Sequence, residues 1–106
     1  MPSIHFVCRD RLNLHRTGSS YESGDWDMPP EEAATLVGGM IYLHQTKGTR
    51  SYFGGRVESF REIDTDRAHG RRIIFKFSFT EAGRGTEWRG SSKPRAHSSG
   101  IIADDV

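Results

Sequence analysis

Residues 71–79 read Arg-Arg-Ile-Ile-Phe-Lys-Phe-Ser-Phe and carry the clearest structural signal in the chain. Four large apolar side chains recur there at every second position: Ile73, Phe75, Phe77 and Phe79. The positions between them are polar or charged, with Ile74 as the one exception. This period of two is typical of a β-strand that buries one face, so we expect residues 71–79 to form a central strand of a sheet.

Three other stretches also have strand character: residues 4–8, 40–44 and 51–63. In the first, Ile4, Phe6 and Cys8 fall on one face. The last contains Gly54-Gly55, and a glycine pair inside a strand indicates a bulge, a barrel corner or a close approach by another group. The later strands are joined by short turns, which favours antiparallel pairing.

One helix is expected, over residues 29–37. Two prolines at its start occupy a turn whose N–H groups have no helical partner, and Gly38-Gly39 ends it. Three residues make its apolar face: Ala33, Leu36 and Val37. We expect the polar residues 16–25 before the helix to form a loop, and the chain to be irregular from about residue 89.

The chain has 106 residues, of which 34% are hydrophobic and 27% charged, so we expect a single domain with a small core. The order of elements predicts an α+β fold: a small, mostly antiparallel, partly closed β-barrel with one short helix. No apolar run approaches the roughly 18 residues that a transmembrane helix needs, and the first residues lack the pattern of a leader peptide. The single cysteine, Cys8, excludes an internal disulfide, and we expect a reducing, cytoplasmic setting.

Basic side chains gather in the middle of the chain. Residues 47–76 contain eight basic and four acidic side chains, a net charge of +4, whereas the whole chain has a net charge of +1. Such a segment is a candidate contact for the phosphates of DNA or RNA. The residues expected to make these contacts are Arg50, Arg56, Arg71, Arg72 and Lys76. The alternative is that these charges lie on solvated strand faces beside acidic neighbours.

No sequence motif for nucleotide binding, metal binding or a nucleophilic serine is present. The five histidines are scattered without metal-ligand spacing, so we expect neither a metal nor a cofactor. A small nuclease or other hydrolase would need a base, an acid and a cation, which His44, Glu58 and Arg56 would supply if their strands paired suitably. The alternative for His44 is a structural strand residue. The sequence favours a non-catalytic protein and leaves enzymatic activity open.

Five aromatic residues exceed what the core around residues 71–79 requires: Trp26, Tyr42, Tyr52, Phe53 and Trp88. Tyr42 shares a strand face with His44, and Tyr52 stands near Gly54-Gly55, where missing side chains leave space. A base stacked on an aromatic ring gains about 1–3 kcal/mol, so these residues form a candidate pocket. The alternative is that they complete the hydrophobic core.

The central stretch resembles a known group of domains. It carries Trp26 before a short helix, then Gly-Met-Ile-Tyr-Leu-His over residues 39–44 and Ser-Tyr-Phe-Gly-Gly-Arg-Val over residues 51–57. Over about residues 24–80 this pattern is similar to the centre of PUA-like domains, the group that includes the EVE and ASCH modules. It also resembles small uncharacterised bacterial and phage proteins. The Gly-x-Lys-x-x-Glu-x-Arg signature of ASCH domains is missing, and the chain is shorter than a typical EVE module.

The resemblance implies a small β-barrel with a helix at one end and a pocket for a nucleobase, often modified, that is flipped out of DNA or RNA. It places seven residues near that pocket: Trp26, Tyr42, His44, Ser51, Tyr52, Gly54 and Gly55. We therefore expect a non-catalytic nucleic-acid-binding module that reads a modified or flipped base. The alternatives are the hydrolase built on His44 and a protein-interaction factor without a small ligand.

Overall fold

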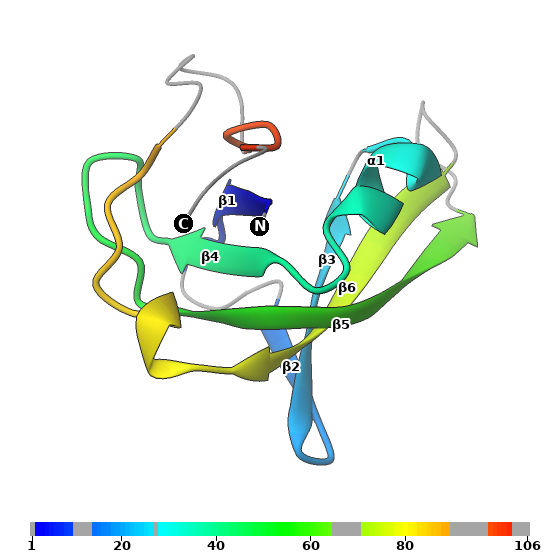
Figure 1. The fold of residues 1–106 in the computed structure, drawn as a ribbon, viewed down its shortest axis with the longest axis horizontal. Helices are drawn as coiled ribbons and strands as arrows, with labels where there is room; N and C mark the ends of the chain where they lie inside the picture. The colour runs from blue at the N-terminus through cyan, green and yellow to red at the C-terminus, as the bar shows by residue number, and fades with distance from the viewer. Residues whose placement is uncertain (1, 10–13, 27, 65–70, 90–97, 103–106) are drawn as a thin grey trace.

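A computed structural model describes residues 2–9, 14–26, 28–64, 71–89 and 98–102 of the chain (Figure 1). Six strands and one helix follow one another in the sequence: β1 (Ser3–Val7), β2 (Leu14–Thr17), β3 (Ser20–Trp26), α1 (Pro30–Thr35), β4 (Met40–His44), β5 (Phe53–Asp64) and β6 (Arg71–Phe79). A short 3₁₀ turn, η2 (Glu81–Gly83), comes after the last strand.

All six strands belong to one sheet, in the order β1-β4-β5-β6-β3-β2. Strand β1 pairs with β4 in parallel, and the other four pairings are antiparallel. Figure 1 shows that the sheet is strongly curved, with β2 and β3 crossing the direction of β4 and β5 at a steep angle. The parallel pair makes this sheet a mixed one. Its edge strands, β1 and β2, do not pair with each other, so the sheet of the described residues is not closed.

Strand β6 lies in the middle of this sheet, as its sequence predicts. It pairs with β5 on one side and with β3 on the other. Ile73, Phe75 and Phe77 are fully buried, with no exposed surface. The alternation of apolar and polar residues therefore identifies both the strand and its buried face.

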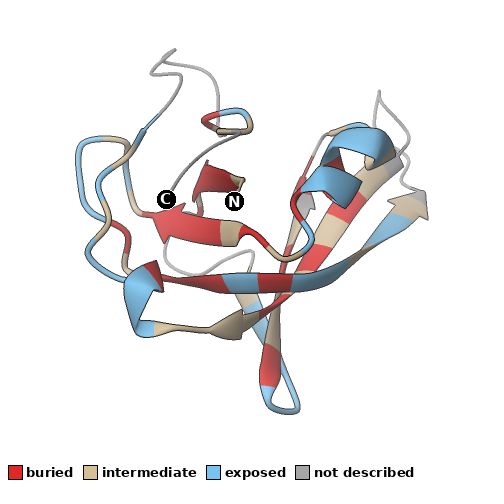
Figure 2. Cartoon of the chain, viewed as in Figure 1, coloured by how far each residue is buried: buried red, intermediate tan, exposed pale blue. Residues whose placement is uncertain are grey.

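The core fills the concave side of the curved sheet. Ile4 and Phe6 of β1 and Ile41 and Leu43 of β4 all lie in it, and Figure 2 shows these two strands as mainly buried. The helix is shorter than expected and contributes Ala33, while Leu36, which follows its last residue, is also buried. The expectation for Val37 is wrong, because 46% of its surface is exposed.

The loop expected over residues 16–25 is wrong. Most of this segment belongs to a hairpin in which β2 and β3 pair through the two-residue turn Gly18-Ser19. Gly18 has a φ of 64°, the left-handed conformation that such a turn requires and that glycine adopts without strain. The segment is too polar to show strand periodicity. Its strand β3 is stabilised by pairing with β6, a contact that composition cannot reveal.

The glycine pair of β5 is explained by the close approach of the protein's own backbone. A Cβ atom at Gly55 would overlap the carbonyl oxygen of Ser78 on β6, and one at Gly54 would overlap that of Ile41 on β4. The open space that the sequence suggested beside these glycines is thus occupied by neighbouring strands. A separate register shift in β5 occurs further on, between Val57 and Ser59.

Residues 98–102 run beside β1 on the edge that β4 leaves open. Antiparallel bridges join Phe6 with Ser98 and Ser3 with Ile102. The irregular segment expected from about residue 89 therefore contains an ordered stretch. No helix among the described residues is long and apolar enough to cross a membrane.

Replacing Phe77 by Ala should lower the free energy of unfolding by about 3–5 kcal/mol, because it leaves a cavity in the centre of the core. Denaturant unfolding followed by circular dichroism measures the loss. The matched control is Val37→Ala on the exposed surface, which should change stability by less than about 0.5 kcal/mol. A similar effect of both substitutions would contradict the placement of β6.

Candidate functional site

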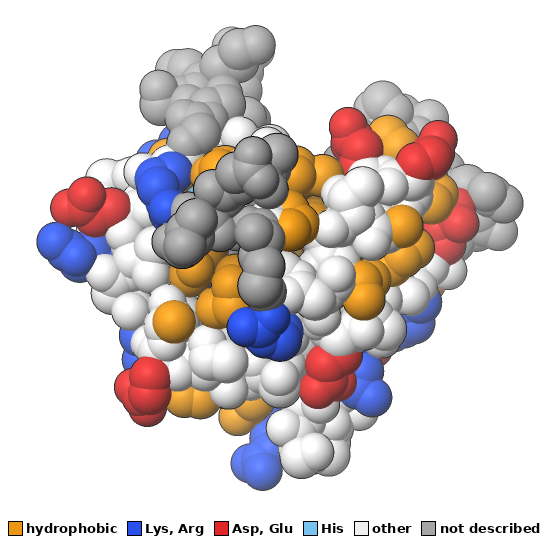
Figure 3. Space-filling view, viewed as in Figure 1, with side chains coloured by type: hydrophobic (Ala, Val, Ile, Leu, Met, Phe, Trp, Pro, Cys, Tyr) orange, Lys and Arg blue, Asp and Glu red, His pale blue; other side chains and the backbone are white. Residues whose placement is uncertain are grey.

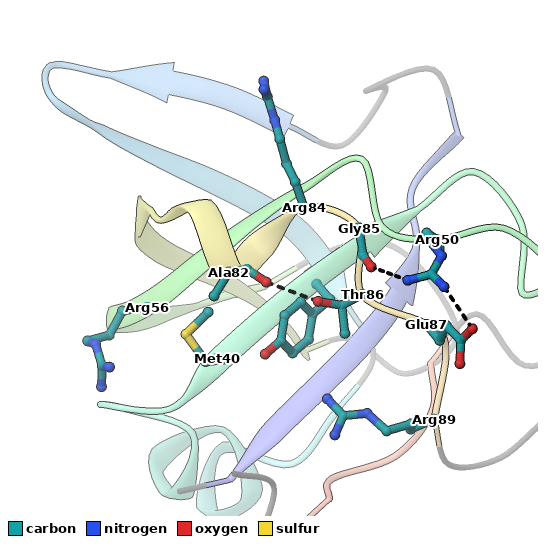
Figure 4. Close-up of a pocket in the computed structure, with 10 residues that line it drawn as sticks. Met40, Arg50, Arg56, Ala82, Arg84, Gly85, Thr86, Glu87 and Arg89 are labelled. Carbon is teal, nitrogen blue, oxygen red and sulfur yellow. Dashed lines mark hydrogen bonds and ion pairs between the residues drawn. The ribbon is translucent and has the colours of Figure 1, made fainter.

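A groove with a volume of about 820 Å³ lies on the side of β4 and β5 that faces away from the core (Figure 4). Ten of the described residues line it: Met40, Tyr42, Arg50, Arg56, Ala82, Arg84, Gly85, Thr86, Glu87 and Arg89. Its floor comes from β4 and β5, and its wall comes from the segment that follows η2. The volume is in the range of small-molecule binding sites.

Two of the residues expected at a ligand hold this wall in place. The Ser51 hydroxyl donates to the carbonyl oxygen of Gly83 over 2.7 Å and accepts from the backbone N–H of Thr86 over 3.0 Å. Gly54 faces Gly83 so closely that neither position has room for a Cβ atom. Ser51 and Gly54 thus fix the segment from which Arg84, Gly85 and Thr86 line the groove, and Gly55 fixes β5 against β6.

The groove has a strong positive charge, with four arginines and one acidic residue. Arg50 forms an ion pair with Glu87 over 3.2 Å and donates to the carbonyl oxygen of Gly85 over 2.9 Å. Arg56 donates to the carbonyl oxygen of Gly38 over 2.7 Å. These bonds hold the two guanidinium groups at the groove, where they favour an anionic ligand.

The other two arginines contact aromatic rings. The Arg89 guanidinium lies 6.0 Å from the centre of the Tyr42 ring, and that of Arg84 lies 5.1 Å from the Phe79 ring. In Figure 4, Arg84 extends away from Arg50, Arg56 and Arg89. Sequence reasoning missed both residues because they belong to a stretch with balanced charges and no strand pattern.

The remaining basic residues of the expected phosphate contacts do not line the groove. Arg72 and Lys76 lie on β6, where Lys76 pairs in register with Glu22 of β3. The backbone of Arg71 begins β6, and its side chain lies outside the described part of the structure. On the face shown in Figure 3, basic and acidic side chains are interspersed rather than gathered in one patch. The groove itself is therefore the better candidate for anion binding.

Most of the aromatic residues expected in a pocket belong to the core. Trp26 is 7% exposed, stacks on Phe6 with ring centres 4.1 Å apart and donates to the Ser23 hydroxyl. Tyr52 donates its hydroxyl to the carbonyl oxygen of Cys8. Of the expected aromatic residues, only Tyr42 lines the groove.

Behind Tyr42 lies a buried pair of histidines, His5 and His44. Strands β1 and β4 place His5 opposite Tyr42 on the face turned away from the core. The two rings stack with centres 4.7 Å apart, and the Trp88 ring covers both histidines at 5.7 and 5.1 Å. Nδ1 of His5 lies 2.8 Å from Nε2 of His44, and neither histidine has exposed surface.

The hydrogen bonds of this pair fix which ring nitrogens carry a proton. Nδ1 of His44 lies 2.8 Å from the carbonyl oxygen of Thr49, which only accepts, so this nitrogen must donate. Nε2 of a neutral His44 then accepts from Nδ1–H of His5. A neutral His5 is left with a lone pair on Nε2, and this buried nitrogen has no hydrogen-bond partner among the described residues.

Electrostatics keep the pair neutral. Burial lowers the pKa of His5 from 6.5 to about 3, and the neighbouring His44 and Arg89 contribute to this shift. Burial also lowers the pKa of His44, although its hydrogen bond to Thr49 opposes the effect. At neutral pH both rings are therefore uncharged, and Nε2 of His5 remains an acceptor.

The three residues considered from the sequence for acid–base catalysis, His44, Glu58 and Arg56, each have different partners in the structure. Both ring nitrogens of His44 are engaged, by His5 and Thr49. The Glu58 carboxylate accepts from the Ser20 hydroxyl over 3.0 Å, and Arg56 is at the groove. Among the described residues, no group of three His, Cys, Asp or Glu side chains is arranged to hold a metal ion.

Comparisons of the chain with family models, with curated proteins and with solved structures found no match. The proposals below therefore rest on the sequence and on the groove with the histidine pair behind it.

Acidification should destabilise the protein through His5. Below pH 6.5 the unfolded chain takes up a proton that folded His5 binds only near pH 3, so stability falls by about 1.4 kcal/mol per pH unit in this window. The nearby groups are His44, Tyr42 and Arg89, with Lys47 over the Trp88 ring.

Urea unfolding of the protein and of His5→Asn between pH 7 and pH 4 measures this effect. Asparagine keeps an N–H near the position of Nδ1 and does not titrate. The stability advantage of the unmodified protein should shrink as the pH falls, and a difference that does not vary with pH would contradict a neutral, buried His5.

Proposed function

We propose that this protein is a non-catalytic module that binds single-stranded nucleic acid, with the sugar-phosphate backbone in the arginine-lined groove. The observation that carries the proposal is that Arg50, Arg56 and Arg89 line one groove, in which Glu87 is the one acidic residue among the described lining residues. Arg84 also lines the groove but extends away from the other three arginines. Phosphate groups are the most common biological ligands that such a set of guanidinium groups recognises.

The size of the groove favours a single strand over a duplex. About 820 Å³ corresponds to the volume of a small ligand, or of a few nucleotides. The residues that the structure describes also include no long helix for the major groove of DNA, since α1 has six residues. A flexible strand can follow a short curved groove, whereas a duplex presents its phosphates on a wide, stiff surface.

The fold is compatible with the resemblance to PUA-like domains, a relationship that we retain as part of the proposal. The resemblance implies a small β-barrel with a helix at one end. The structure shares the small size, the curved sheet and the single helix of the described residues, but its sheet is not closed. In this proposal the site combines phosphate contacts from the groove with contacts to a base near Tyr42. Trp26 and Tyr52 then contribute through the core and not through the ligand.

Binding of a fluorescein-labelled ten-nucleotide thymidine strand, followed by anisotropy from about 50 to 300 mM salt, tests the proposal. We expect the logarithm of the association constant to fall linearly with the logarithm of salt, by about 0.7 for each phosphate contact. Arg56→Gln and Arg89→Gln should each weaken binding and reduce this slope by about 0.7.

Arg61→Gln is the matched control. Arg61 is an exposed arginine that pairs with Glu22 over 3.2 Å and does not line the groove. Its replacement should leave the affinity and the salt slope unchanged. Absence of binding at about 50 mM salt, or an equal loss in all three variants, would exclude the groove as a nucleic-acid site.

A further inference from the structure

Nε2 of His5 is a buried acceptor whose lone pair finds no hydrogen-bond partner within the described part of the chain. A buried acceptor without a hydrogen bond costs about 1–3 kcal/mol, and such groups in proteins usually have a function or a missing partner. The hydrogen bonds from Thr49 through His44 fix the orientation of this ring, so its lone pair has a defined direction. The ring is thus pre-organised to accept a hydrogen bond.

The surroundings of His5 indicate the shape of the group that could donate a hydrogen bond to its Nε2. Two aromatic rings flank it, Tyr42 at 4.7 Å and Trp88 at 5.7 Å. Tyr42 and Arg89 also line the groove, so His5 lies directly behind the groove floor. A flat ring with an N–H on its edge suits a place bounded by aromatic faces, whereas a charged amine or an anion does not.

Access to His5 depends on Trp88. Its ring is half-buried and covers both histidines from the segment that also carries Glu87 and Arg89. Ser51 holds this segment at Gly85 and Thr86, before Trp88 is reached. Movement of the indole therefore uncovers His5 while Arg84, Gly85 and Thr86, which precede Trp88, keep their anchor at Ser51.

We propose that Nε2 of His5 is the acceptor that reads an N–H donor on the edge of a base, in a subsite behind the groove that opens when the Trp88 ring moves aside. This inference rests on the proposed function and names the residue that would provide its base selectivity. The ligand class is a pyrimidine or purine with an imino or amino N–H. A base without that N–H would leave the acceptor unpaired and is rejected.

Three pairs of five-nucleotide strands test the proposal. Each pair consists of a natural homopolymer and its methylated form: thymidine with N3-methylthymidine, deoxycytidine with N4,N4-dimethyldeoxycytidine, and deoxyadenosine with N6,N6-dimethyldeoxyadenosine. Methylation removes the N–H and preserves the phosphates. For at least one pair, it should weaken binding about tenfold, the effect of one hydrogen bond.

The variants assign the effect to His5. His5→Asn keeps a donor for His44, and His5→Phe keeps a planar ring, but neither has Nε2. Both should bind the natural and methylated strands equally, whereas His15→Phe on the exposed hairpin should behave as the unmodified protein. Trp88→Ala should keep the discrimination and bind more tightly. Thermal unfolding checks that each variant is folded, and retained discrimination in a folded His5 variant would overturn the assignment.

An abasic five-nucleotide strand separates this inference from the proposed function. If the abasic strand binds as tightly as the natural strands and methylation has no effect, the groove binds phosphate but the His5 subsite is wrong. The same result is expected if a buried water satisfies Nε2, and it would overturn the inference. If no strand binds at all, the proposed function itself fails.

Discussion

Backbone packing between β5 and its neighbours is the constraint on which the groove depends. Gly54 faces both Ile41 of β4 and Gly83 of η2 at distances that exclude a side chain. This contact brings η2 against the sheet, and from there Ser51 can bind Gly83 and Thr86. The arginines after η2 reach the groove because three glycines carry no Cβ: Gly54, Gly55 and Gly83.

The sequence predicts the strands well where one face of the strand is apolar. Residues 4–8, 40–44 and 71–79 are strands within one residue of their expected bounds. The β2–β3 hairpin could not be predicted in this way, because its polar side chains show no periodicity and its pairing with β6 is a long-range contact. The helix is identified but shorter, because the N–H groups of Leu36 and Val37 bond to carbonyl oxygens three residues back rather than four.

Only part of the candidate site could be predicted from the sequence, because the rest depends on contacts between strands. Tyr42, Arg50 and Arg56 are found because they lie on or beside strands with a clear pattern. The importance of His5 depends on the parallel register that sets it opposite Tyr42, and a strand's own periodicity says nothing about its neighbour. Glycines in strands mark close approach correctly, but they do not say whether a ligand or the chain itself approaches.

The polar groups of the groove and those of the histidine pair lie in different environments. Arg50 and Arg56 are held at the surface of the groove by carbonyl oxygens and by one ion pair, so water or a ligand can reach their charge. The histidines are buried and uncharged, in a chain of hydrogen bonds that begins at the Thr49 carbonyl. Orientation in the pair is thus set by its hydrogen bonds.

The pairing of residues 98–102 with β1 has a consequence for how the protein is made. Strand β1 is made before both of its neighbours: β4 starts at residue 40, and residues 98–102 come nearly a hundred residues after β1. Contacts between such distant segments form slowly, because the intervening chain must first be brought together. During synthesis, β1 therefore has one edge without a partner until residues 98–102 have been made.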